Sequence, residues 1–350
     1  MAARQLTKRG RPGSRRNNWE SLDDEALLQL RFRDLQLRLT DSLIEPDVTR
    51  LYSELERRGI RFRPHIWLST EWFSPDGIPG IAVPFFAAHP RLRRLEHRML
   101  GEVEGGNRKW RIRILRHETG HALDSAYRLR RRKDWREVFG AASRPYPQGY
   151  RVRPRSRDYV QHIGYWYAQS HPVEDFAETF AVWMQPKARW RREYEGWPAL
   201  EKLEFVDELM AEIAPQPPSK RDRSHVAPLS QNSRTLGEHY RRKTSYADRI
   251  DRRYDDWLRE TFARRTDRPR GARASRFIRD ARPKLRKLLL AATQSGPYLI
   301  DHAIDRVTLR ARQLDLVVVG SRRDNIRNVS WLLENVVHDI VHRNKDYFDL

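Results

Sequence analysis

Residues 111–127 read RIRILRHETGHALDSAY, and this stretch decides how the rest of the chain is interpreted. His117 and His121 are four residues apart, so on a helix they lie on one face and can direct imidazole nitrogens at a single metal ion. Glu118 flanks that position and can take a proton from water that the metal activates. The letters match the H-E-x-x-H zinc motif, although two surface histidines on an amphipathic helix would give the same spacing.

One further residue of this helix bears on the metal. Asp124 lies on the same helical face, three residues after His121 and seven after His117. From there its carboxylate is expected to accept a hydrogen bond from a ligand histidine.

A second segment supplies acidic side chains downstream. Residues 165–184 read YWYAQSHPVEDFAETFAVWM, in which Ser170 and Pro172 suit the start of a helix. On that helix Glu174 and Glu178 share one face, so one carboxylate can complete a metal site while the other braces a ligand. Two exposed glutamates on a surface helix are the alternative, against which the mostly apolar remainder of the helix argues. If Glu174 is not the third ligand, the other candidates are Glu178, His171 and His162.

Together the two motifs resemble the gluzincin peptidases of the anthrax-lethal-factor-like type. More closely, they are similar to a bacterial family described only as zinc-binding metallopeptidases. The resemblance covers about residues 60–210 and rests on H-E-T-G-H-A-L-D at 117–124 and on Y-x6-E-D-F-A-E-T-F at 167–180. It implies one zinc ion per chain, held by His117, His121 and Glu174.

The resemblance also implies roles for the neighbouring residues. Glu118 would be the general base, and Glu178 would support a ligand without binding the metal. Tyr167 would lie across the metal, where a phenol can stabilise an oxyanion or protonate the leaving amine. Asp124 matches an acidic position of the family's helix. The expected activity is hydrolysis of a peptide or amide bond.

Composition limits the ligand types and the location. The 350 residues contain no cysteine, so disulfides and thiolate ligands are excluded and zinc must be held by His, Asp and Glu. No apolar run approaches the roughly 20 residues of a membrane helix. The basic N-terminus lacks the apolar segment of a secretory signal, so a cytoplasmic location is expected.

The charge suggests an alternative class of function. With 69 Lys and Arg against 47 Asp and Glu, the formal charge is +22, and such a chain attracts polyanions. The alternative is a basic protein that binds nucleic acid or another polyanion and has a structural or inactive zinc site. The arginine-dense stretch 128–158 is either a basic rim that selects an acidic peptide or protein substrate, or a solvated helix end and loop.

The pattern of elements predicts a helix-rich α+β fold. A small sheet is expected from strands near 60–68 and 80–86, and its edge would hold an extended substrate. The expected divisions are a disordered basic tail at 1–18, a zincin-like metallopeptidase domain at 19–213, a proline-rich linker at 214–235 and a basic helical region at 236–350. Within the last region, helical patterns cover about 236–264, 274–292, 298–313 and 325–343.

The C-terminal region carries a second histidine pair. His338 and His342 are also four residues apart, but no paired acidic helix follows them. We therefore interpret them as part of a core helix whose last turn favours histidine, rather than as a metal site. The region as a whole could serve as an assembly or inhibitory module.

Overall fold

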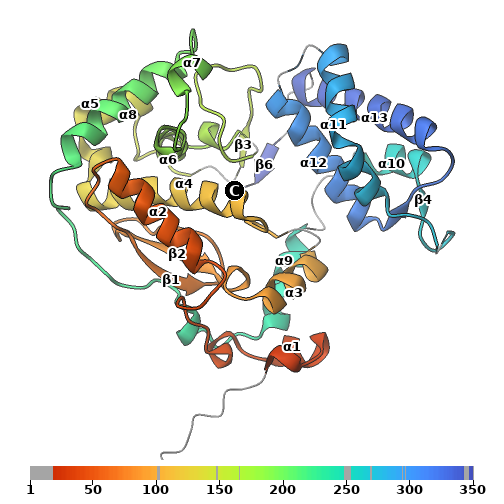
Figure 1. Cartoon of the computed structure of the whole chain (residues 1–350), viewed down its shortest axis with the longest axis horizontal. Coiled ribbons are helices and arrows are strands. Elements are labelled where there is room, and N and C mark those ends of the chain that lie inside the picture. Colours follow the sequence, from red (N-terminus) through yellow and green to blue (C-terminus); the bar gives the residue numbers. More distant parts are fainter. Residues whose placement is uncertain are drawn as a thin grey trace, which may run out of the picture.

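The computed structural model describes residues 19–349 except 101–102, 147–148, 165, 248–253, 269, 294, 296 and 343–346. The basic tail expected at 1–18 lies outside the described residues. The described part is rich in helices and contains a few short strands, which confirms the α+β prediction at that level (Figure 1). Among the described helices, none is long and apolar enough to cross a bilayer.

The chain up to residue 247 contains the two expected strands and then the two expected site helices, in that order. Its helices and strands are α1 (Asp24–Gln29), α2 (Glu45–Arg57), β1 (His65–Ser69), β2 (Gly80–Pro84), α3 (Pro90–Leu100), α4 (Arg108–Tyr127), α5 (Lys133–Phe139), β3 (Gly149–Arg151), α6 (Pro172–Met184), α7 (Trp190–Glu193), α8 (Ala199–Ile213) and α9 (Leu236–Ala247).

The remaining elements form a mainly helical group. They are α10 (Asp255–Thr261), β4 (Ala263–Arg264), α11 (Ala274–Thr293), α12 (Pro297–Gln313), β5 (Leu316–Val317), α13 (Arg322–His342) and β6 (Tyr347–Asp349). The helical pattern expected at about 236–264 corresponds to α9 and α10, and the chain turns into β4 after α10 ends at Thr261.

The sheet ahead of the metal helix is small. Strands β1 and β2 pair in parallel, with His65 opposite Gly80. The strand expected from residue 60 begins only at His65, because the preceding alternating residues are buried in the core without pairing to a strand. On the other side of β2, Phe73 forms an antiparallel bridge in which the Ala82 N–H donates to the Phe73 carbonyl at 2.8 Å. Residues 72–74 therefore form the outer edge of this sheet.

Two hydrophobic clusters organise the described residues. The first surrounds α2, α3, α4, α6 and α8, and it also takes in Leu236 and Tyr240 of α9. The second lies among α10–α13, which stand together on one side of the molecule (Figure 1), and it includes Tyr150 and Trp166 from the chain around β3 and α6. The C-terminal helices are thus packed against the part of the chain that leads into α6.

The proline-rich stretch 214–235 is hydrogen-bonded to strand β1. The Trp67 indole N–H donates to the Val226 carbonyl at 3.0 Å, and the Ser69 hydroxyl donates to the Ala227 carbonyl at 2.8 Å. These bonds attach the stretch along β1 and lead it to α9, so in the structure it follows the surface of the sheet as an ordered segment.

Candidate metal centre

Helix α4 carries the histidine pair through the middle of the first cluster. It begins at Asn107, whose side-chain oxygen accepts from the Trp110 N–H at 2.9 Å, and it ends where Arg128 adopts a left-handed conformation with φ of 56°. Nearly every residue from 111 to 126 is buried. Burial of charge is costly unless it is paired. Accordingly, Arg111 and Arg116 form ion pairs with Asp47 and Glu54 of α2.

Helix α6 crosses α4 at the residue between the two histidines. A Cβ atom built on Gly120 would lie 2.9 Å from the Cα of Ala177 and 3.3 Å from its Cβ. The two backbones can approach this closely because both residues are small. This crossing places the first turns of α6, with their two glutamates, directly over the histidine face of α4.

We expect Gly120→Ala to weaken the site through this crossing. The added methyl group must push α6 away from α4, which costs about 1–3 kcal/mol of unfolding free energy, against a gain of up to ~1 kcal/mol from helix propensity. Denaturant unfolding and zinc titration would measure both effects. Gly164→Ala is the matched control, because a Cβ there meets no atom within 4 Å. A Gly120→Ala variant that is more stable than wild type would contradict the expected contact.

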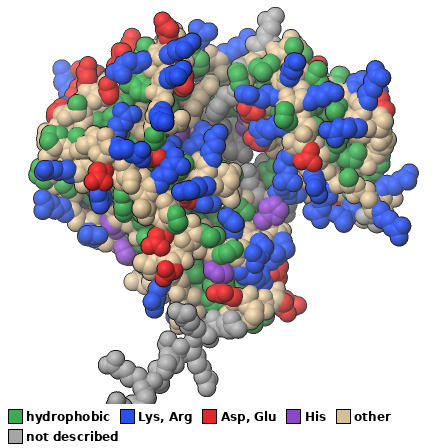
Figure 2. Space-filling model, in the orientation of Figure 1, with side chains coloured by type: hydrophobic (Ala, Val, Ile, Leu, Met, Phe, Trp, Pro, Cys, Tyr) green, Lys and Arg blue, Asp and Glu red, His purple; other side chains and the backbone are tan. Residues whose placement is uncertain are grey.

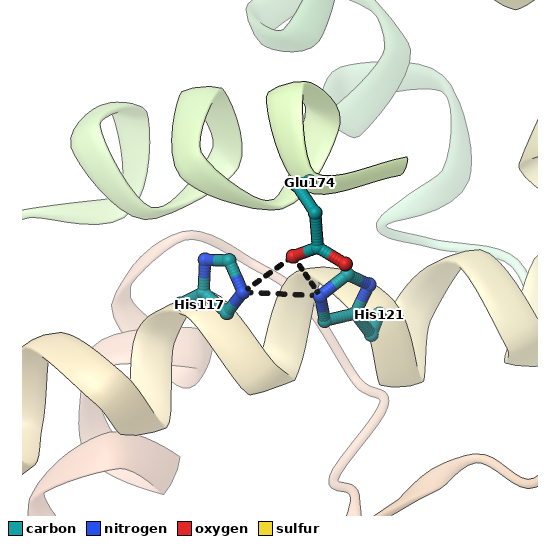
Figure 3. A group of neighbouring side chains, drawn as sticks. All are labelled: His117, His121 and Glu174. Carbon is teal, nitrogen blue, oxygen red and sulfur yellow. Dashed lines mark hydrogen bonds and ion pairs between the residues drawn. The ribbon is translucent and has the colours of Figure 1, made fainter. Parts of the chain in front are cut away.

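The structure brings His117, His121 and Glu174 together in one buried group (Figure 3). The Nε2 atoms of the two histidines are 3.0 Å apart, and each lies 3.1 Å from Oε2 of Glu174. Ligand atoms about 2.0–2.2 Å from a tetrahedral zinc ion would be ~3.3 Å apart. The three atoms are therefore spaced as the ligands of one small cation require.

Glu178 orients the first of these histidines. Its Oε1 lies 2.8 Å from Nδ1 of His117, and its Oε2 accepts from the Ile163 N–H at 2.8 Å. When Nδ1–H of His117 donates to this carboxylate, Nε2 is left with a lone pair that faces His121 and Glu174. Two imidazole nitrogens and a carboxylate oxygen are ligand types that zinc takes, so this donor set fits a metal cation.

The electrostatics of the group also favour a bound cation. Burial raises the pKa of Glu174, but the adjacent His121 and His117 outweigh it and hold that pKa well below its usual range. Burial opposes a charge on His117, yet hydrogen bonds to Glu174 and Glu178 raise its pKa well above the usual value. Positive charge is thus stabilised between the two carboxylates, where a metal ion would displace the proton.

Two polar side chains flank the cluster without joining it. Glu118 lines the cleft into which His117, His121 and Glu174 also point, and burial raises the pKa of its carboxyl. The Tyr167 ring centroid is 5.6 Å from that of His117. Burial, followed by the negative charges of Glu174 and Glu118, raises the pKa of this phenol well above 10. Tyr167 therefore keeps its proton at neutral pH and can donate a hydrogen bond into the cleft.

A second tyrosine reaches the site from a loop that no sequence pattern singled out. The Tyr146 hydroxyl donates to Oε1 of Glu174 at 2.8 Å, and its ring stacks on His171 with centroids 4.0 Å apart. Nε2 of His171 lies 2.9 Å from the Arg144 carbonyl oxygen, and its Nδ1 accepts from the Val173 N–H at 3.2 Å. His171 thus fixes the loop over the site and, in place of the expected Ser170, caps α6.

The bond expected between Asp124 and a ligand histidine is not among the hydrogen bonds that the structure gives this residue. Asp124 instead accepts from the main-chain N–H of Arg130 at 2.8 Å and forms an ion pair with its guanidinium. The left-handed residue Arg128 turns the chain back at the end of α4 and brings Arg130 onto the carboxylate. Asp124 therefore closes the end of the helix.

The group of His117, His121 and Glu174 opens into a cleft of about 910 Å³. One side is lined by α4, α6 and residues 72–74, and the other by residues of α11 and α12, among them His302. Among the described residues of the arginine-dense stretch 128–158, only Tyr146 lines the cleft, so the interpretation of this stretch as a basic rim is not supported.

The second histidine pair lies only partly within the described residues. His338 is exposed on α13, and the side chain of His342 lies outside the described residues. The group among the described residues whose side chains could hold a metal ion is that of His117, His121 and Glu174.

This helix pair presents to a cleft two histidines and a glutamate that could hold one metal ion. Residues 109–189, which span α4 to α6, match the model of a family described as "Putative zinc-binding metallo-peptidase". No curated protein and no solved structure matches the chain. The matched segment contains all of the site residues named from the two sequence motifs.

Proposed function

We propose that this protein is a zinc-dependent metallopeptidase of the gluzincin type with a zincin-like catalytic domain. The observation that carries the proposal is the convergence of two histidine Nε2 atoms and one glutamate oxygen within 3.0–3.1 Å, beside a free carboxylate and at the bottom of a cleft. A purely structural zinc site is instead closed by four protein ligands. The family match over residues 109–189 supports the same class.

His117, His121 and Glu174 would hold the zinc ion, with Glu178 fixing the orientation of His117. Bound zinc supplies Lewis acidity, which polarises a carbonyl group and lowers the pKa of water. Glu118 accepts the proton of the attacking water and delivers it to the leaving nitrogen. Its raised pKa suits this exchange, because a carboxylate with a higher pKa is a stronger base.

Tyr167 is proposed to donate its phenolic proton to the oxygen on which negative charge develops. Its raised pKa keeps the phenol protonated, and it lines the same cleft as Glu118. A Tyr167→Phe variant with unchanged kcat would remove this residue from the mechanism.

The substrate is proposed to bind as an extended chain along residues 72–74. The main-chain groups of Phe73 are bonded to Ala82, so in an antiparallel arrangement those of Trp72 and Ser74 face away from β2. All three residues line the cleft. A peptide lying there could pair with this edge and pass over the metal.

The proposal is tested by metal analysis and peptide cleavage. We expect purified wild type to contain about one zinc per chain and to cleave peptides, and His117→Ala to lose both properties. Exposed His97→Ala, on α3, is the control for removing a histidine outside the cluster. Zinc retained by His117→Ala would point to the His338 and His342 pair, and a wild type that takes up no zinc would favour the basic binding protein.

A further inference from the structure

The first half of α4 carries five basic residues that divide between two faces. Three of them face α2 and form ion pairs there: Arg108 and Arg111 contact Asp47 at 2.9 and 2.7 Å, and Arg116 contacts Glu54 at 2.8 Å. These pairs attach α4 to α2, and they account for the basic residues that point away from the metal.

The other two basic residues, Lys109 and Arg113, line the cleft. They lie eight and four residues before His117, so the helical repeat places all three along one side of α4. Arg113 is half-buried, which strengthens its electrostatic interactions relative to a fully solvated cation. Within the described part of the chain, neither cation forms an ion pair with a carboxylate.

The other charges of the cleft are largely engaged elsewhere. Asp76 pairs with Arg130 at 2.9 Å, and on the opposite wall Asp301 and Asp305 contact Arg282 at 3.2 and 2.5 Å. The negative charge of Glu104 interacts with the Lys243 ammonium group and favours its charged form. Within the cleft, the positive charge available to a ligand is therefore that of Lys109 and Arg113 on α4. Over the face drawn in Figure 2, Lys and Arg side chains are spread widely among the other residues.

We propose that Arg113, with Lys109 beyond it, binds a carboxylate of the peptide substrate close to the scissile bond. This inference rests on the proposed peptidase function and names the substrate class of the same site. The planar guanidinium of Arg113 can form two parallel hydrogen bonds with a carboxylate, whereas Lys109 adds a point charge. The carboxylate belongs either to an Asp or Glu side chain or to the free C-terminus of a short peptide.

The test uses zinc-loaded full-length protein and fluorogenic peptides that share one frame. Each position on either side of the cleaved bond is varied among Glu, Gln and Lys, and every peptide is made with a free and with an amidated C-terminus. We expect wild type to prefer Glu to Gln at one position by about 10- to 100-fold in kcat/KM. A preference confined to peptides with a free C-terminus would assign the carboxylate to the chain end.

Three variants assign the preference to Arg113. Arg113→Glu is expected to reverse it in favour of Lys, and Lys109→Glu to weaken it. Arg136→Glu is the matched control: Arg136 is an exposed residue of α5 outside the cleft, the change in charge is the same, and the Glu preference should persist. Zinc content is measured for each variant, so that loss of the site is recognised.

The outcomes separate the inference from the function on which it rests. Cleavage by wild type without a carboxylate preference, or equal shifts in Arg113→Glu and Arg136→Glu, would overturn the inference and leave the peptidase function standing. A zinc-loaded wild type that cleaves no peptide in the panel would overturn both.

Discussion

Replacing Glu118 with glutamine is expected to leave the zinc content unchanged and to lower kcat by about 100- to 10,000-fold, the range typical of a lost general base. The carboxylate forms no hydrogen bond or ion pair with another described residue, so its removal should leave the fold and the ligand geometry intact. Glutamine has nearly the same volume but cannot accept the proton. Zinc per chain and kcat on a cleaved peptide are the two measurements.

Asp305→Asn provides the control for Glu118→Gln. It removes a negative charge from the opposite wall of the same cleft, and we expect it to change kcat only a few-fold. If Glu118→Gln also lost zinc, Glu118 would have a structural role. If it kept the activity, another group would have to act as the base, and the proposed mechanism would be wrong.

Sequence spacing predicted the helices that carry the site better than it predicted their contacts. The four-residue interval between His117 and His121 determines a shared face on any α-helix, and the same interval holds for Glu174 and Glu178. Spacing alone could not predict which of the two glutamates lies beside the Nε2 atoms of both histidines. The answer depends on how closely α6 packs on α4, where Ala177 approaches Gly120, and this is set by tertiary packing.

The features that the sequence did not reveal depend on contacts between distant or irregular segments. Tyr146 lies in a loop without periodicity, and it reaches Glu174 because His171 holds the neighbouring carbonyl of Arg144. Asp124 lies in the helix that the sequence predicted, but the turn after α4 gives it Arg130 as a partner. Neither contact follows from residue spacing within one helix.

The two glutamates of α6 allow the ligand assignment to be tested on one helix. We expect Glu174→Ala to lower zinc affinity by more than the roughly 10–100-fold typical of residues that only support a ligand, and Glu178→Ala to stay within that range. Both side chains are almost fully buried, at 5% and 1% exposure, and lie one turn apart, so the loss of packing is similar. The difference between the variants therefore reports which carboxylate contacts the metal, and competition with a zinc chelator measures it.

Equal or reversed effects would move the third ligand away from Glu174, and the structure limits where it could go. His171 uses its ring nitrogens on the Arg144 carbonyl and the Val173 N–H, and His162 Nε2 lies 3.1 Å from the Arg113 carbonyl. Either histidine would have to break these bonds and rotate before it could bind the metal. Glu178 would have to release Nδ1 of His117. Among the four candidates, Glu174 alone has an oxygen 3.1 Å from Nε2 of both His117 and His121. Its removal is therefore expected to have the larger effect.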